Sequence, residues 1–124
     1  MRDFKELKIW QKGMEIVKVT YDVIEQLPNT EKFGLASQCG RASVSIPSNI
    51  AEGCARKSKA HFIQFLETSL GSTYELETQV LIIQSRFTVD EELSNKLLTL
   101  LEEEKKMLGS YIASISKQAN SLIP

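Results

Sequence analysis

The stretch from residue 38 to residue 77 constrains the fold of this chain more than any other part of the sequence. It begins with QCGRASVSIPSNIAEG at 38–53 and ends with GSTYELE at 71–77. Apolar residues recur there at the three- and four-residue spacing of helices. Polar residues share that spacing, and Pro47 stands in the middle of the first segment. Burial of an apolar stripe alone does not explain this pattern, so the stretch identifies a particular helical fold, although its residues disclose no chemical activity.

Four amphipathic segments divide the chain. Their apolar spacing predicts helices at 6–27, 35–54, 58–86 and 90–119. We expect Ser58 to cap the third helix, and a capping box that starts at Thr88 to begin the fourth. No segment alternates with a period of two residues, as a half-buried strand would. The sequence therefore predicts an all-α fold, an antiparallel up-down-up-down four-helix bundle, in one domain that spans 1–124.

The first predicted helix carries apolar residues over more of its surface than one seam needs. Its main line is Leu7, Trp10, Met14, Val17, Tyr21 and Ile24, and a second line is Ile9, Ile16, Val23 and Leu27. A stripe of this width is typical of a helix that packs against two neighbours. Because Ile9, Ile16 and Val23 lie off the main line, we expect them to form an exposed patch that other subunits cover.

Pro47 is expected to kink the second helix. Proline has no N–H, so the carbonyl of Ser43 loses its helical partner. A helix boundary at Ser45–Ile46 is the alternative. The apolar spacing stays in phase across Pro47 and no turn residues flank it, which favours one kinked helix.

Polar residues form a stripe on each of the two middle helices. The set predicted to form a structural network is Gln38, Arg41, Ser45, Asn49, Glu52, Ser72 and Glu75. The two helices are antiparallel, so residues at equal sequence distances from the turn at 55–58 should lie opposite each other. This places Arg41 near Ser72 and Glu75, and Asn49 near Thr68. A buried arginine needs an acidic partner, so we predict an Arg41–Glu75 ion pair between the two helices. A network that fixes helix register is the favoured interpretation, and a polar pocket is the functional alternative.

The chain lacks the common signatures of catalysis and of metal binding. It has no phosphate-binding glycine loop and no paired-cysteine zinc motif. His61 is the single histidine, so two Glu-x-x-His motifs for a di-metal bundle are not present. Cys39 and Cys54 are fifteen residues apart on one predicted helix, or about 22 Å, which is too far for a disulfide. We expect no catalytic residue, metal or cofactor, and two buried thiols.

The turn at 56–61 carries the candidate nucleic-acid site: Arg56, Lys57, Lys59 and His61. The net charge is −1, but residues 32–61 carry +4 and residues 62–104 carry −7. For one monomer, a solvated turn is the favoured interpretation of the basic cluster. Several copies on one oligomer would add their phosphate contacts. No apolar run is long enough to span a bilayer and no secretory leader is recognisable, so we expect a cytoplasmic protein with no membrane partner.

Several motifs resemble those of the 23S rRNA intervening-sequence proteins, a family of small four-helix bundles. The matching segments are F-x-x-L-x-x-W at 4–10, FGL at 33–35, Q-x-x-R at 38–41, SIPSNIAEG at 45–53, RK at 56–57, FL at 65–66 and GS-x-x-ELE at 71–77. The resemblance implies a homo-oligomeric ring, commonly a homopentamer. It implies no activity, because the family name reflects where some of the genes lie.

These observations together predict a non-enzymatic, homo-oligomeric helical bundle that works as a scaffold or binding module, with no small-molecule substrate identified. The alternative is an accessory protein that binds RNA or DNA weakly, without sequence preference, through the basic turn. The least favoured interpretation is an enzyme that uses the region of Arg41 and Glu75.

Overall fold

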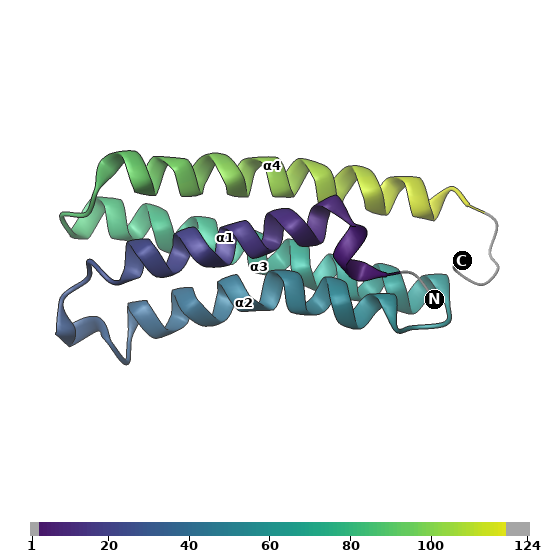
Figure 1. The fold of residues 1–124 in the computed structure, drawn as a ribbon, viewed down its shortest axis with the longest axis horizontal. Helices are drawn as coiled ribbons and strands as arrows, with labels where there is room; N and C mark the ends of the chain where they lie inside the picture. The colour runs from purple at the N-terminus through teal and green to yellow at the C-terminus, as the bar shows by residue number, and fades with distance from the viewer. Residues whose placement is uncertain (1–2, 119–124) are drawn as a thin grey trace.

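The computed structural model describes residues 3–118 and places most of them in four long helices (Figure 1). These are α1 (Lys8–Ile24), α2 (Leu35–Cys54), α3 (Lys59–Arg86) and α4 (Glu91–Ser116). Short 3-10 turns, η1 (Phe4–Glu6) and η2 (Asn29–Glu31), precede α1 and α2. Within residues 3–118 there is no β-strand, so the predicted all-α fold is confirmed. None of the helices in that range is long and apolar enough to cross a membrane.

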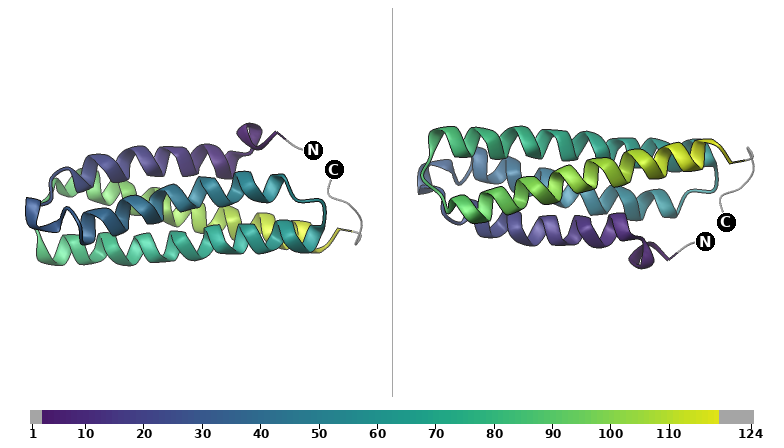
Figure 2. Two further views of the ribbon diagram at one scale, coloured as in Figure 1. Left: turned by 90° about the horizontal axis from the view of Figure 1, so that it is seen from below. Right: turned by 90° about the horizontal axis from the view of Figure 1, so that it is seen from above.

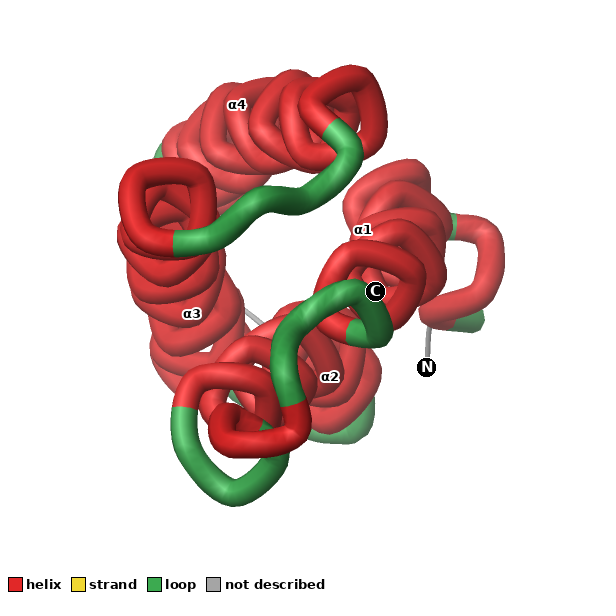
Figure 3. Tube along the Cα trace, turned by 90° about the vertical axis from the view of Figure 1, so that its left-hand side faces the viewer, coloured by secondary structure: helices red, strands yellow, loops and turns green. Residues whose placement is uncertain are grey.

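The four helices lie side by side and alternate in direction (Figures 1 and 2). The end view in Figure 3 shows them at the corners of a four-sided arrangement, in which α4 returns to lie beside α1. Each helix therefore packs against two neighbours, and the apolar side chains meet along the bundle axis. This is the predicted up-down-up-down bundle.

Side-chain caps define the starts of α3 and α4. Ser58 caps α3 as predicted, because its Oγ accepts the N–H of His61 at 3.2 Å. The prediction that Thr88 begins the capping of α4 is wrong. Asp90 occupies that position, and its carboxylate accepts the N–H of Leu93 at 3.0 Å. A capping side chain must directly precede the first helical residue to reach these amides, and Thr88 lies two positions too early. The predicted end of the fourth helix at 119 lies outside the described residues, but α4 already ends at Ser116 and Lys117 is its C-cap.

The core-facing line of α1 is not the predicted main line. The buried line is Ile9, Gly13, Ile16, Thr20 and Val23, and Leu27 continues it just after the helix ends. Met14 and Tyr21, from the predicted main line, are each 45% exposed. Both lines repeat with alternating four- and three-residue steps, so both satisfy helical periodicity. Gly13 and Thr20 complete the buried line but do not register as apolar, which made the wrong line look stronger. The expected exposed patch of Ile9, Ile16 and Val23 is therefore wrong.

Helix α2 continues without interruption through Pro47, so the alternative boundary at Ser45–Ile46 is wrong. The kink at Pro47 stays a prediction. Two neighbouring helices come close to α2 at this point. A Cβ placed on Gly13 of α1 would lie 3.3 Å from the Cβ of Pro47. On the α3 side, the Ser69 hydroxyl donates to the carbonyl of Ile46 at 2.8 Å. Small residues on α1 and α3 thus allow close packing on both sides of the proline.

Among the described residues, the core contains an acidic side chain that no sequence motif marks. Glu104 of α4 is fully buried, and neither of its carboxylate oxygens has a hydrogen-bond partner. Burial raises the pKa of Glu104 from 4.5 to about 8, and the Lys12 ammonium opposes this in part. The carboxyl is therefore mostly protonated at neutral pH. Lys12 itself forms an ion pair with the adjacent Glu103, with 2.6 Å between Nζ and Oε1.

Candidate functional site

The polar residues predicted to join α2 and α3 divide into a hydrogen-bonded centre and an exposed border. In the centre, the hydroxyls of Ser45 on α2 and Ser72 on α3 are 2.8 Å apart. The Asn49 amide donates to the Ser45 carbonyl at 2.8 Å and to its Oγ at 2.9 Å. All three side chains are half-buried. The Ser45–Ser72 bond joins α2 to α3, and Asn49 holds Ser45 from within α2, so this centre helps to fix how the two helices pack.

The predicted ion pair between Arg41 and Glu75 is wrong. Both residues are exposed, and in the described part of the chain no ion pair joins them. Glu75 Oε2 instead accepts a hydrogen bond from the Gln79 amide at 3.3 Å. The physical reason is that Cys39 and Ala42 occupy the core side of this part of α2. Arg41 therefore starts on the solvent side, where water solvates both charges. Gln38 and Glu52 are exposed as well.

Two shallow grooves flank Arg41. One lies between α2 and α3, has a volume of about 300 Å³, and is lined by Gln38, Arg41, Ala42, Ser45, Ser72 and Glu75. The other lies between α1 and α2 and has a volume of about 460 Å³; Tyr21, Arg41 and Val44 are among its lining residues. An exposed guanidinium can bind a carboxylate or a phosphate with two parallel hydrogen bonds. The predicted polar set thus borders an open surface more than it fills a buried pocket.

Two of the basic residues at the α2–α3 turn interact with other parts of the chain. The Lys59 ammonium donates to the carbonyls of Gln118 at 2.7 Å and Ser116 at 3.5 Å, at the end of α4. A cation is favourable there because the last carbonyls of a helix carry partial negative charge. The Arg56 guanidinium stacks 4.8 Å from the ring centre of Phe65. His61 and Lys57 are exposed.

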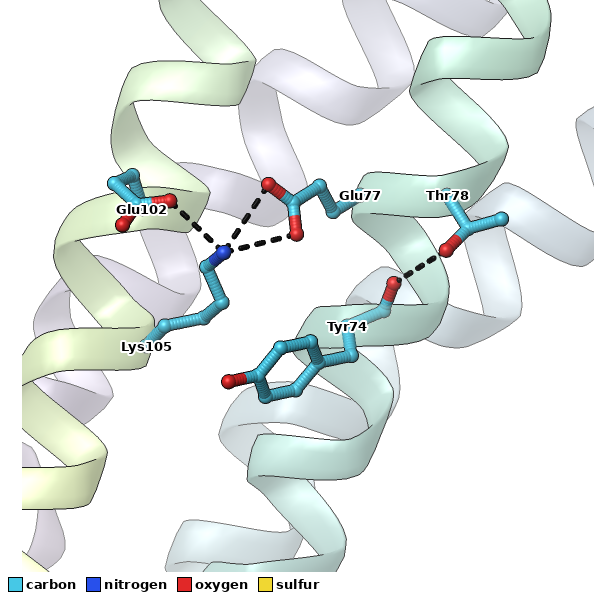
Figure 4. Close-up of polar contacts among 5 residues, drawn as sticks. All are labelled: Tyr74, Glu77, Thr78, Glu102 and Lys105. Carbon is cyan, nitrogen blue, oxygen red and sulfur yellow. Dashed lines mark hydrogen bonds and ion pairs between the residues drawn. The ribbon is translucent and has the colours of Figure 1, made fainter.

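A charged cluster between α3 and α4 was not found from the sequence. Figure 4 shows the Lys105 ammonium between two carboxylates, at 3.0 and 3.2 Å from the oxygens of Glu77 and 2.8 Å from Glu102. Hydrogen bonds to Glu102 and Glu77 raise the pKa of Lys105, and the one from Lys105 lowers the pKa of Glu102. The spacing of Glu102 and Lys105 signals their pairing in the sequence. Only tertiary packing brings Glu77 to them.

Tyr74 lies beside this cluster, on the side of α3 that faces α4 (Figure 4). The Lys105 ammonium is 5.1 Å from the centre of its ring, and the Thr78 hydroxyl donates to its carbonyl at 3.0 Å. The Tyr74 side chain is nevertheless 55% exposed. It therefore adds an aromatic surface to the outside of the bundle.

The two cysteines are buried and do not form a disulfide. Burial raises the pKa of the Cys39 thiol to about 12, and the negative charge of Glu75 contributes to the rise. A thiol in this environment is a poor nucleophile. Across residues 3–118, no group of three or more His, Cys, Asp or Glu side chains is arranged to hold a metal ion.

Comparison with known proteins supports the family resemblance. The model of a family described as 23S rRNA-intervening sequence protein matches residues 5–110. A crystal structure from Bacteroides thetaiotaomicron, of a protein with unknown function from the S23 ribosomal protein family, is 25% identical and has a TM-score of 0.77. The similarity covers 85% of this chain and 95% of that chain. No curated protein sequence matches this chain.

Proposed function

Because this chain belongs to the 23S rRNA-intervening sequence protein family, we propose that it acts as a non-enzymatic, homo-oligomeric bundle that serves as a scaffold or binding module. Membership of this family does not indicate an activity, because the matched crystal structure is of a protein with unknown function. The proposal therefore rests on the surface of the bundle and on its polar residues.

The observation that carries the proposal is an exposed apolar surface where α1 and α2 meet. We call it the α1–α2 edge and define it by Met14, Tyr21 and Val44, which are 45%, 45% and 41% exposed. Tyr21 and Val44 line one groove, and Met14 lies two helical turns before Tyr21 on the same side of α1. An apolar surface of this kind on a small domain indicates a contact with another protein.

The polar residues between α2 and α3 support a structural role over a catalytic one. Ser45, Asn49 and Ser72 use their hydrogen-bonding groups on one another. The Ser45 and Ser72 hydroxyls are half-buried between two helices, and among the described residues no base contacts them to activate them, as nucleophilic catalysis requires. Such a centre keeps two helices in register, which is what a scaffold needs.

The test is the mass of the protein in solution, measured by light scattering at micromolar concentration. The expected result is a mass several times the 14.0 kDa of one chain. We propose five subunits, the number that the family resemblance implies. Replacing Met14 and Val44 by Glu should lower the mass, because two charges would have to be buried in the contact. A wild-type mass of one chain contradicts the proposal.

The alternative function, weak binding of RNA or DNA through the basic turn, has less support. Lys59 and Arg56 already contact the end of α4 and Phe65, and residues 62–104 carry a net charge of −7 that repels a phosphate backbone. Lys57 and His61 remain exposed for such a contact.

A further inference from the structure

We propose that the subunits of this assembly meet through two different edges of the bundle, so that the α1–α2 edge of one copy packs against an α3–α4 edge of the next. This inference rests on the proposed homo-oligomer and names the surfaces that form its contact. The α3–α4 edge is defined by Tyr74 and Leu81.

The α3–α4 edge carries a second exposed apolar pair. Tyr74 is 55% exposed and Leu81 is 50% exposed. They are seven residues, or about two turns, apart, so they lie on the same side of α3. The contact between Tyr74 and Lys105 turns this side toward α4 (Figure 4). Met14 and Tyr21 have the same seven-residue spacing on α1, so each edge presents an apolar pair of equal length.

The two edges lie on opposite sides of the bundle. In Figure 3, α1 and α2 occupy one side of the four-sided arrangement, and α3 and α4 occupy the other. A twofold contact joins a surface to its own copy and would leave the other edge of each subunit exposed. A head-to-tail contact joins unlike surfaces, so every subunit in the assembly buries both edges.

The charges of the two halves favour this pairing. Residues 3–58, which contain α1 and α2, hold eight basic and seven acidic residues, a formal net charge of +1. Residues 59–118, which contain α3 and α4, hold six basic and nine acidic residues, a formal net charge of −3, or −2 with the buried Glu104 protonated. Contacts between unlike halves therefore bring opposite net charges together, whereas contacts between like acidic halves repel. This complementarity supports a second copy of the same chain as the partner.

Contacts inside the chain bracket the level of the α1 pair on α3. Going around the bundle through α2, contacts lead from position 13 of α1 to Ser69 of α3. Going around through α4, the Lys12–Glu103 ion pair and, two residues further along α4, the Lys105–Glu77 ion pair lead to Glu77. The stretch of α3 between these two limits contains Tyr74. Because α1 and α3 run in the same direction, the two apolar pairs extend the same way along the bundle axis.

The two apolar pairs have equal spacing and run in the same direction. When the two edges meet, Met14 can therefore approach Tyr74, and Tyr21 can approach Leu81, of the neighbouring copy.

Two variants, each with one altered edge, test the pairing. The first carries Met14→Glu and Val44→Glu, and the second carries Tyr74→Glu and Leu81→Glu. A matched control carries Gln64→Glu and Thr99→Glu, two exposed positions outside both edges. Circular dichroism establishes whether each variant keeps its helix content. A variant that loses helix content is replaced by one with serine, instead of glutamate, at the same two positions. Light scattering then gives the mass of each protein alone and of the two edge variants mixed in equal amounts.

The expected result is that each edge variant alone has the mass of one chain, while the mixture has the mass of two. In the mixture, the intact α3–α4 edge of the first variant can bind the intact α1–α2 edge of the second, and no further copy can add. The control should keep the wild-type mass. Two outcomes would overturn the inference while the homo-oligomer remains. In the first, the wild type is oligomeric and the Tyr74→Glu, Leu81→Glu variant keeps the same mass. In the second, the two edge variants do not combine when mixed. A wild type with the mass of one chain overturns both.

Discussion

Replacing Glu104 by Gln should remove a strong pH dependence from the stability of this bundle. The Glu104 side chain is fully buried, and its carboxylate oxygens have no hydrogen-bond partner. Burial raises its pKa from 4.5 to about 8. Between these two values the folded chain keeps a proton at Glu104 that the unfolded chain releases. Stability should therefore be highest below about pH 4.5 for this group and should fall as the pH rises toward 8.

The size of the effect follows from the difference between the two pKa values. Each pH unit between them costs about 1.4 kcal/mol of unfolding free energy, so the interval from 4.5 to about 8 amounts to roughly 5 kcal/mol. At pH 7, Glu104 should cost the wild type about 3 kcal/mol relative to its stability at low pH. Glutamine has nearly the same shape and no ionisable proton, so it removes this term. Its amide also needs buried partners, which lowers stability equally at every pH.

The assay is urea unfolding followed by circular dichroism, from about pH 5 to about pH 8.5, with all proteins at one concentration because association adds to stability. The quantity of interest is the difference in unfolding free energy between wild type and Glu104→Gln. Other titrating groups are common to both proteins and cancel. Glu103→Gln is the matched control, because it removes the adjacent exposed carboxylate and leaves the buried one. A difference that does not change with pH would refute the reasoning.

Three further outcomes are expected. In urea unfolding, Gly53→Ala should destabilise the fold by about 1–3 kcal/mol, because the new Cβ would lie 2.9 Å from the Phe65 side chain. Gly71→Ala should instead stabilise its helix by up to about 1 kcal/mol, because a Cβ there has no neighbour within 4 Å. Mass spectrometry after treatment with a thiol reagent at mildly alkaline pH should find Cys39 unmodified in the folded protein and modified in denaturant, because it is buried with a pKa raised to about 12. Fluorescence anisotropy with a short labelled RNA should show binding only at low salt, and Lys57→Ala should weaken that binding. Lys59→Ala should instead lower the thermal stability, because the Lys59 ammonium binds carbonyls at the end of α4. RNA binding that survives physiological salt would favour the nucleic-acid function.

Local signals in the sequence were sufficient for the helices and for part of the packing. Helix starts depend on side chains a few residues away, which is why Ser58 could be identified as a cap. A short turn also fixes the pairing of the two helices it joins. Counting from that turn placed Arg41 beside Ser72 and Glu75, and these residues do line one groove. The count could not tell that Arg41 and Glu75 point to solvent.

The candidate functional surface depended on information that is not local. Two lines of α1 have equal helical spacing, and only the positions of α2 and α4 determined which one is buried. Lys59 reaches the end of α4, and Glu77 reaches Lys105, across contacts between helices far apart in the chain.

The sequence by itself determined how many helices this protein forms, where most of them begin and end, and to which family the chain belongs. These properties depend on periodicity, caps and short motifs, which act over a few residues. The tertiary structure decided which faces are exposed, which charges are paired, and that the Glu104 carboxyl lies in the core. Those properties depend on how each helix is rotated about its own axis, and that rotation is set by the packing of all four helices at once.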